Sequence, residues 1–491
     1  MFIECLLDSV SSRPDRLAAR DPFRELSNAQ LARFARVISR IVRKETACER
    51  VGVMLPASTA GLGTLLGVLW AGRTAVPLNF LMQPPELAAV AKDARIDLIL
   101  ATRHFESQLA NMPVRVLYLE QLPLKRFYLL EGLRRTPKPP RVSQDDLAAI
   151  VYTSGSTGQP RGVCLSHGNL MSNCRAAAEH FHLDSSHHLL GMIPPFHVFG
   201  LTIIKLLPVV IGAAITYVPR FSPQAVVEVA RRGEVSVIMA VPSMFAAIAR
   251  LKSVTPGDFP GIRLAVSGGE PLPNNLYEEV RRKTGLNLLE GYGMTETSPV
   301  ISANQPGAQR VGSVGRPIPG VEVQVRDTAG RALPTGETGE LYVRGPGVMK
   351  GYFNRPQETA ATVDADGWLR TGDIVHIDAD GFITITGRAK EMMIVAGENV
   401  YPREVEAVLE RHPSVREAAV IGRRDEHRGE AVVAFVIPGE NTAPTANELR
   451  AFCRDHLASH KIPREVHVVQ DLPRGPTGKI LKRELKARVE T

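Results

Sequence analysis

The feature that most restricts the fold of this chain is an alternation, from residue 51 to about residue 270, of short apolar runs with segments of helical spacing. Short β-branched and apolar runs without polar alternation are typical of strands buried on both faces, as in parallel sheets. The segments between them, such as 84–94 and 223–233, have the spacing of amphipathic helices. The pattern therefore predicts α/β layers built on largely parallel sheets. The predicted strands are 51–55, 74–78, 96–100, 114–119, 213–218, 235–241 and 262–267.

After about residue 300 the alternation of strand and helix patterns gives way to strand patterns alone. Short strand patterns broken by Gly and Asp, such as GVEVQVRD and DIVHIDADGFITIT, predict a β-rich subdomain with hairpin turns. A smaller α+β unit follows a boundary at 387–390, with helices predicted from Pro402 and over 447–457. A length of 491 residues exceeds one ordinary core, so two or more domains are expected.

Charge limits the classes of partner. Lys and Arg number 59 against 51 Asp and Glu, which gives a net charge of +8 spread thinly along the chain. Nucleic-acid binders more often concentrate basic residues in one stripe, so no nucleic-acid partner is predicted. The basic segment 125–143 is interpreted as an exposed connector, with contact to a partner or to a membrane surface as the alternative.

Cysteine usage and apolar stretches indicate the compartment. The five cysteines are widely scattered without a CxxC pair, which argues against a disulfide framework and against a zinc site. The N-terminal segment lacks a basic n-region, so no secretory signal is predicted. The longest apolar stretches are interrupted by Arg73 and Lys205, so no transmembrane segment is predicted. A cytoplasmic location is therefore expected.

The strongest local signal lies in AAIVYTSGSTGQPRGVCLSHGNL, residues 148–170. A predicted strand runs into six Thr, Ser and Gly residues, 153–158, and a second apolar run follows Arg161. Small residues let backbone N–H groups close around an anion, hydroxyls add donors, and Arg161 adds charge. The segment is not a Walker loop, because GxxxxGK[ST] is absent and a strand follows. A solvated turn is the alternative, and the length of the run favours a phosphate site.

This loop resembles the signature of the adenylate-forming superfamily, which includes acyl-CoA synthetases, peptide-synthetase adenylation domains and luciferase. Other segments resemble the family's motifs in the family's order across nearly the whole chain, and they look most like fatty acyl-CoA synthetases. One position departs from the pattern: Arg161 stands where Lys is usual, so a planar fork replaces a point charge. The matching segments are PPFHVFG (194–200), SGGEPLP (267–273), EGYGMTETSP (290–299), GWLRTGD (367–373), GRAKEMMIVAGENVYPREVE (387–406) and PRGPTGKILKREL (473–485).

The resemblance implies an α/β fold in several parts. A large N-terminal AMP-binding domain, 1–387, would combine α/β layers with a distorted β-barrel subdomain. A hinge at 388–390, centred on Lys390, would lead to a small mobile α+β C-terminal domain, 391–491. ATP and Mg²⁺ are the implied cofactors and CoA the implied co-substrate, with an acyl carrier protein as the alternative acceptor.

The resemblance also assigns residue roles. The implied catalytic residues are Lys479, Thr295, Glu296 and Arg161. The implied ATP- and AMP-binding residues are Thr153, Ser154, Gly155, Ser156, Thr157, Gly158, Gly269, Glu270, Pro271, Gly291, Tyr292, Gly293, Thr295, Asp373, Arg388 and Lys479. The implied Mg²⁺ ligands are Glu296 and Thr153. The implied acyl pocket comprises His197, Val241, Gly268, Gly293 and Met294, and the implied thiol tunnel is bordered by Gly397 and Glu398.

Together these observations predict an ATP-dependent acid:thiol ligase. A carboxylate is a poor electrophile until its oxygen attacks the α-phosphate of ATP, and the enzyme's main task in that step is positioning and charge neutralisation. The apolar segment 237–245 offers no Asp for an α-ammonium group, which favours a fatty or other hydrophobic acid. The resemblance to fatty acyl-CoA synthetases implies free CoA as the acceptor. His197, flanked by apolar residues, is interpreted as a pocket wall rather than a general base. The alternatives are a stand-alone ligase that loads an acyl carrier protein, an inactive nucleotide-binding scaffold, and a luciferase-like oxidase.

Overall fold

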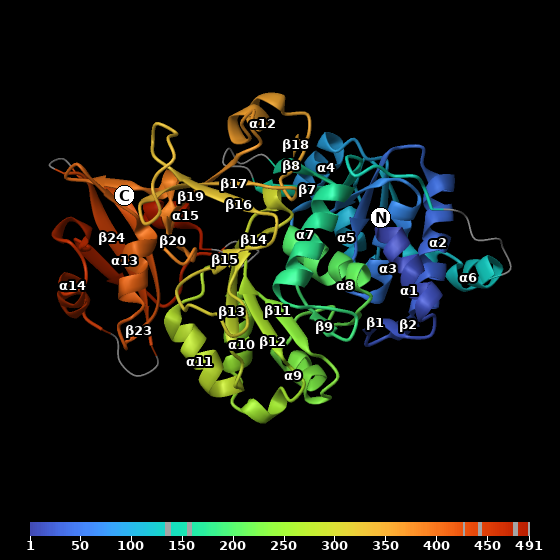
Figure 1. The fold of residues 1–491 in the computed structure, drawn as a ribbon, viewed down its shortest axis with the longest axis horizontal. Helices are drawn as coiled ribbons and strands as arrows, with labels where there is room; N and C mark the ends of the chain where they lie inside the picture. The colour runs from blue at the N-terminus through green and yellow to red at the C-terminus, as the bar shows by residue number, and fades with distance from the viewer. Residues whose placement is uncertain (133–138, 155–159, 426–427, 440–443, 475–479, 490–491) are drawn as a thin grey trace.

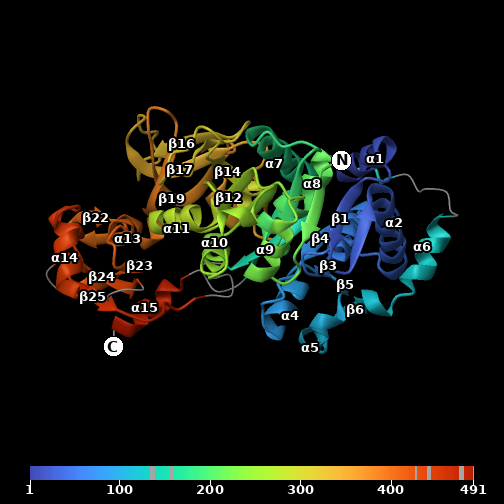
Figure 2. The ribbon, with the colours of Figure 1, turned by 90° about the horizontal axis from the view of Figure 1, so that it is seen from below.

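The computed structural model of the chain describes residues 1–132, 139–154, 160–425, 428–439, 444–474 and 480–489. Within these ranges the strands form two large sheets and two smaller ones. The residues after about 390 form a small domain at one end of the molecule, and helix α6 (Leu124–Gly132) lies at the opposite end (Figures 1 and 2). In the described part of the chain no helix is long and apolar enough to cross a membrane.

The first large sheet has seven strands in the order β18-β8-β7-β4-β3-β5-β6. Strands β7, β4, β3, β5 and β6 run parallel. At one edge β8 pairs antiparallel with β7, and β18 pairs antiparallel with β8. The predicted strands 51–55, 74–78, 96–100 and 114–119 are confirmed as members of this sheet. Its strands are β3 (Arg50–Met54), β4 (Thr74–Pro77), β5 (Leu98–Ala101), β6 (Arg115–Tyr118), β7 (Leu147–Ser154), β8 (Pro160–Ser166) and β18 (Gly351–Tyr352).

The second large sheet has nine strands in the order β15-β14-β13-β12-β11-β9-β10-β1-β2. Its centre is parallel, and the strands at both edges are antiparallel. The remaining three predicted strands belong to this sheet, which confirms the α/β prediction. Its strands are β1 (Leu17–Asp21), β2 (Arg24–Ser27), β9 (His188–Gly191), β10 (Ala214–Tyr217), β11 (Val237–Ala240), β12 (Leu264–Gly268), β13 (Leu288–Gly293), β14 (Val300–Ala303) and β15 (Arg316–Pro317).

Helices separate and cover the two large sheets. The largest apolar core lies between the sheets and includes the central helices, while separate cores lie on the outer face of each sheet. The central helices are α1 (Phe2–Ser12), α2 (Asn28–Glu45), α3 (Thr59–Trp70), α7 (His167–His180), the π-helix η3 (Gly200–Leu206) and α8 (Leu207–Ile211). The outer helices are α4 (Pro84–Asp93), α5 (Glu106–Leu109), α9 (Pro223–Arg231), α10 (Pro242–Ala249) and α11 (Asn274–Thr284).

Helix α3 is apolar on all sides because it is enclosed between the sheets. Two of its glycines allow α2 to approach closely. A Cβ atom at Gly63 would lie 2.1 Å from Phe34, and one at Gly67 would lie 2.5 Å from Ile38. The glycines in TAGLGTLLGVLW are therefore required by packing.

The β-rich subdomain predicted after residue 300 is present. It contains an antiparallel sheet in the order β16-β17-β19-β20, with helix α12 (Pro356–Thr362) inserted before β19. In the described residues this sheet is open, and no closed barrel is found. Its strands are β16 (Glu322–Arg326), β17 (Thr338–Arg344), β19 (Leu369–Ile377) and β20 (Ile383–Arg388).

The small domain has its own apolar core. Its sheet runs β22-β21-β24-β23, and β25 pairs with β24. The two helices predicted for this unit are confirmed as α13 and α14. The elements are β21 (Met393–Val395), β22 (Glu398–Val400), α13 (Pro402–Leu409), β23 (Val415–Asp425), β24 (Gly429–Pro438), α14 (Ala446–Arg454), β25 (Glu465–Val468) and α15 (Lys482–Val489).

The first part of the basic segment 125–143 is helix α6, which packs on α2. Its Glu131 is buried and pairs with Arg36 and Arg40, at 3.3 and 2.6 Å, whereas Leu129 on the same helix is 71% exposed. The segment is therefore anchored to the large domain by an ion-pair cluster that its basic composition did not predict.

Candidate active site

The predicted phosphate loop connects β7 to β8, as the strand–loop–strand interpretation requires. Thr153 and Arg161 face each other in the antiparallel register of these strands. Gly155, Ser156, Thr157 and Gly158 lie outside the described residues, and so does Lys479. Ser154 ends β7. The two flanks of the loop are thus in place, and they bring Thr153 and Arg161 together.

A second predicted group, Asp373, Arg388 and Tyr292, forms one hydrogen-bonded cluster. Asp373 on β19 and Arg388 on β20 are register partners, and Arg388 Nε lies 2.8 Å from Asp373 Oδ1. The Tyr292 hydroxyl donates to Asp373 Oδ2. Burial, together with the Asp373 carboxylate, raises the pKa of Tyr292 well above its usual value. The cluster holds a buried carboxylate between β19 and the end of β20, and a carboxylate is a natural acceptor for a diol.

Glu296 and Thr295 lie in a short 3₁₀ turn, Thr295–Thr297, that follows β13, and both are buried. The Tyr352 hydroxyl donates to Glu296 Oε1 at 2.8 Å. Burial and the nearby Glu296 carboxylate raise the pKa of Tyr352. The phenol therefore stays protonated and fixes one oxygen of Glu296 in position.

Arg161 connects this acid to α12. Its guanidinium carbon lies 4.8 Å from the centre of the Tyr352 ring, a cation–π distance. Its Nη1 donates to Glu358 Oε2 at 3.3 Å, and Glu358 also accepts from Arg355 at 3.0 Å. The two arginines hold the pKa of Glu358 below its usual range. A path of contacts thus runs from Glu358 through Arg161 and Tyr352 to Glu296.

Gly268 and Gly293, predicted for the acyl pocket, lie on β12 and β13, which pair with each other. Gly268 and Gly291 are register partners. A Cβ atom at Gly268 would lie 3.7 Å from the Phe199 ring, and one at Gly269 would lie 3.5 Å from Val241. Gly269 also has a φ of +86°, which favours glycine. The nearest side chains around these two glycines are apolar.

Gly293 and Met294 continue β13 toward Glu296. A Cβ atom at Gly293 would lie 2.0 Å from the carbonyl oxygen of Pro299, so only glycine fits there. His197 lies before the π-helix, and its Nδ1 accepts from the Phe199 N–H at 3.3 Å. Its side chain has accessible surface, yet the surrounding protein atoms lower its pKa by desolvation. The structure therefore supports a neutral wall residue at His197 better than a charged one.

Glu270 and Pro271 follow Gly269 in the loop predicted to meet adenine. Burial raises the pKa of Glu270, and the charge of Arg474 from the small domain opposes that rise. Arg474 forms an isolated bridge with Ile480, and these two residues flank the undescribed residues 475–479. One flank of the segment that ends at Lys479 therefore faces the predicted nucleotide loop.

The small domain also contacts α11 of the large domain. Asn275 Nδ2 donates to the carbonyl oxygens of Val415 and Arg416, at 3.2 and 3.0 Å. Gly397 and Glu398, predicted for the thiol tunnel, lie at the exposed tip of the β21–β22 hairpin, where a Cβ atom at Gly397 would meet nothing within 4 Å. Lys390 is exposed in a short 3₁₀ turn, Ala389–Glu391, directly after β20. The predicted hinge is thus a short connection between two sheets.

Glu296 fits a magnesium ion that arrives with a nucleotide. No group of three or more His, Cys, Asp or Glu side chains that could hold a metal occurs in the described ranges. Mg²⁺ is usually bound through one or two carboxylates together with substrate phosphates. A single buried carboxylate, connected to Arg161 through Tyr352, matches that donor set, and Thr153 is the register partner of Arg161.

The layered fold, the phosphate loop and the ribose-type cluster define an adenylate-forming enzyme. The AMP-binding enzyme model matches residues 6–353 and its C-terminal domain model matches residues 404–479, so the chain belongs to the AMP-binding enzyme family. The chain is 35% identical to a feruloyl-CoA synthase from Amycolatopsis sp, over 90% of this chain and 89% of that protein. It is also 35% identical to a long-chain-fatty-acid–CoA ligase from Yersinia pestis, over 89% and 85%. The crystal structure of ATP-bound MatB from Rhodopseudomonas palustris superposes with a TM-score of 0.91 at 30% identity and covers 99% of both chains.

Sequence reasoning missed Tyr352, Arg355 and Glu358. All three lie in KGYFNRPQE, 350–358, which was not singled out. The aromatic-basic-acidic spacing within this segment was the available signal. That spacing indicates a site only once β18 is known to pair with β8. The pairing places Tyr352 opposite Val163, two residues after Arg161.

Proposed function

We propose that this chain activates a hydrophobic carboxylic acid, most naturally a fatty acid, as an acyl-adenylate and transfers the acyl group to free CoA. The reaction class is that of an AMP-forming acid–thiol ligase with ATP, Mg²⁺ and CoA. The observation that carries the choice of acid is the apolar wall of Phe199 and Val241 around Gly268 and Gly269. The relatives named for feruloyl-CoA and for long-chain fatty acids both point to acids with apolar bodies.

In the first step, separate groups of residues would bind the ribose and the phosphates of ATP. Asp373 would accept hydrogen bonds from the ribose hydroxyls, with Arg388 and Tyr292 holding its carboxylate in place. Loop 153–158 and Arg161 would surround the β- and γ-phosphates. These contacts orient the α-phosphate toward the carboxylate, and positioning of this kind is the main source of rate in phosphoryl chemistry.

Glu296, with Thr153, would hold Mg²⁺ against the phosphates, and the ion would neutralise charge as pyrophosphate leaves. Thr295 would contact the α-phosphate beside it. Lys479 would balance the charge that develops between carboxylate and α-phosphate. After adenylation, rotation about 388–390 would bring Gly397 and Glu398 to the thiol.

Pyrophosphate release with Mg-ATP and a panel of acids tests the proposal. The panel contains C4 to C18 fatty acids together with ferulate, and CoA or a phosphopantetheinylated carrier protein is added second. We expect release with at least one hydrophobic acid and acyl-CoA formation with CoA. If the chain binds ATP but none of the acids supports pyrophosphate release, an inactive scaffold is favoured. If only the carrier protein becomes acylated, the carrier protein replaces CoA as the proposed acceptor.

A further inference from the structure

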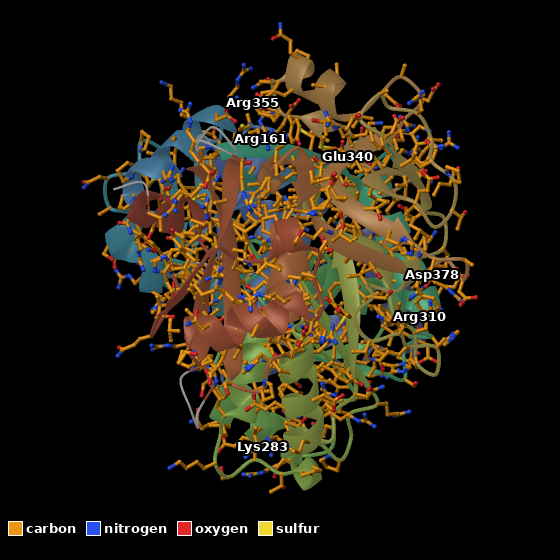
Figure 3. All side chains as sticks on the ribbon, turned by 90° about the vertical axis from the view of Figure 1, so that its left-hand side faces the viewer. Arg161, Lys283, Arg310, Glu340, Arg355 and Asp378 are labelled. Carbon is orange, nitrogen blue, oxygen red and sulfur yellow. The ribbon has the colours of Figure 1, made fainter. Side chains whose placement is uncertain are left out.

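Two arginines from separate parts of the chain converge on one carboxylate beside the predicted magnesium site. Arg161 is the second residue of β8, and Arg355 directly precedes α12 (Figure 3). Arg161 Nη1 lies 3.3 Å from Glu358 Oε2, and Arg355 Nη1 lies 3.0 Å from Glu358 Oε1. One carboxylate is thus shared by two guanidiniums.

The position of this pair points toward the polyphosphate. Arg161 is the register partner of Thr153 and stacks on Tyr352, whose hydroxyl holds Glu296. Burial and Asp93 raise the pKa of Tyr152, and the charge of Arg355 opposes that rise. Arg355 therefore lies close to Tyr152. Tyr152 directly precedes Thr153. Both guanidiniums therefore lie at the flanks of the phosphate loop.

The contacts with Glu358 are weak enough to be exchanged. The side chains of Arg161, Arg355 and Glu358 are 23%, 26% and 40% exposed, and ion pairs this accessible contribute little to stability. The Nε–H groups of both arginines are buried without a hydrogen-bond partner among the described residues. A phosphate group offers more acceptor oxygens than a carboxylate and suits the planar guanidinium fork.

We propose that Arg355 is a second binding residue for the pyrophosphate portion of ATP, paired with Arg161, and that Glu358 occupies both guanidiniums until the nucleotide enters. This inference rests on the proposed function and adds one binding residue and one intramolecular competitor to it. It also suggests how the chain uses Arg161 where the resembling family usually has Lys, because a planar fork that pairs with the Glu358 carboxylate also suits the phosphate that replaces it.

A purely structural role makes a different prediction. If the Arg355–Glu358 pair only stabilised the start of α12, removal of either partner would have the same effect on the site. The proposal instead requires opposite effects, because Arg355 binds the anion and Glu358 competes with it. The directions of two substitutions therefore distinguish the two roles.

Titration calorimetry with magnesium pyrophosphate, Mg-ATP and AMP tests the proposal on the full chain. Arg355→Met is expected to weaken pyrophosphate and ATP binding about tenfold, as for loss of one charge-assisted contact, and to leave AMP affinity unchanged. Glu358→Gln is expected to strengthen pyrophosphate binding severalfold, and Arg355→Lys should retain part of the affinity. Arg331→Met, which removes another arginine paired with a carboxylate at 2.8 Å, is the matched control and should change nothing.

Unchanged pyrophosphate affinity in Arg355→Met overturns the proposal, as does a change in the same direction in Arg355→Met and Glu358→Gln. AMP binding without pyrophosphate binding by the wild-type chain overturns it as well. Retained AMP binding shows that each variant is folded. The acid panel tests the proposed function separately. If the wild-type chain releases pyrophosphate with at least one acid, the proposed function stands whatever the binding results are. If it releases none with any acid, the proposed function is refuted.

Discussion

Replacement of Glu290 by Gln is predicted to change how the stability of the large domain depends on pH. Glu290 lies on β13, and its Oε1 accepts the Leu272 N–H of the predicted adenine loop at 3.1 Å. Burial raises its pKa from 4.5 to about 7, with the Leu272 hydrogen bond and the charge of Arg403 opposing the rise. The protonated form of Glu290 is therefore the form that the fold favours.

The sign and the magnitude follow from linkage. Because the folded pKa exceeds the unfolded one, the folded state binds more protons, and stability present below pH 4.5 is lost as pH rises to about 7. A pKa of about 7 against 4.5 corresponds to roughly 3 kcal/mol. Glu290 keeps some accessible surface, so solvent screening reduces the expected effect to about 2 kcal/mol. Gln keeps an acceptor oxygen for Leu272 and does not titrate in this range.

Urea unfolding at pH 5 and pH 8 measures the effect. The fluorescence of Trp70 and Trp368, the only two tryptophans, reports on the large domain that contains Glu290. We compare the free energy of unfolding of Glu290→Gln with that of the wild type at each pH. The difference in favour of the variant should be about 2 kcal/mol larger at pH 8 than at pH 5. Glu410, whose pKa burial also raises to about 7, is present in both proteins and cancels in the difference. Parallel pH profiles would refute the reasoning.

Four further substitutions have distinct expected outcomes. Gly293→Ala places a Cβ atom 2.0 Å from the Pro299 carbonyl oxygen, so a loss of about 1–3 kcal/mol is expected, and an unchanged Tm would contradict it. Lys205→Met removes an ammonium group whose pKa is lowered well below 10.5 by burial. Wild-type stability, measured by urea unfolding, should therefore rise with pH up to about 10.5, because the unfolded state binds more protons than the folded state. The same rise in the variant would show that Lys205 does not cause it. Lys390→Pro should spare adenylation and abolish thioester formation, whereas Lys479→Ala should slow adenylation about a hundredfold and spare transfer from supplied acyl-AMP. Equal damage to both half-reactions in both variants would exclude rotation about the hinge.

Much of the fold could be predicted from sequence because its signals are local. Short apolar runs between helical segments are sufficient to predict buried parallel strands, and the seven strands predicted before residue 270 are all present. Glycine and hydroxyl residues in 153–158 indicate an anion site because their chemistry depends little on distant parts of the chain. The ordered motifs likewise place Asp373 and Arg388 in one predicted binding site, although only the pairing of β19 with β20 gives them a 2.8 Å contact.

The tertiary structure decided what depends on distant segments. Nothing near Tyr352 in the sequence predicts that its hydroxyl reaches Glu296, 56 residues away, because that contact requires β18 to pair with β8. The sharing of Glu358 by Arg161 and Arg355 has the same origin, since 197 residues separate Arg161 from Glu358. Sequence by itself determined the layers, the motifs and the reaction class, because each depends on composition and order over short windows. Strand pairing in the large domain decided the contacts of Tyr352 with Glu296 and of Arg161 with Glu358, because it brings together side chains that no local pattern connects.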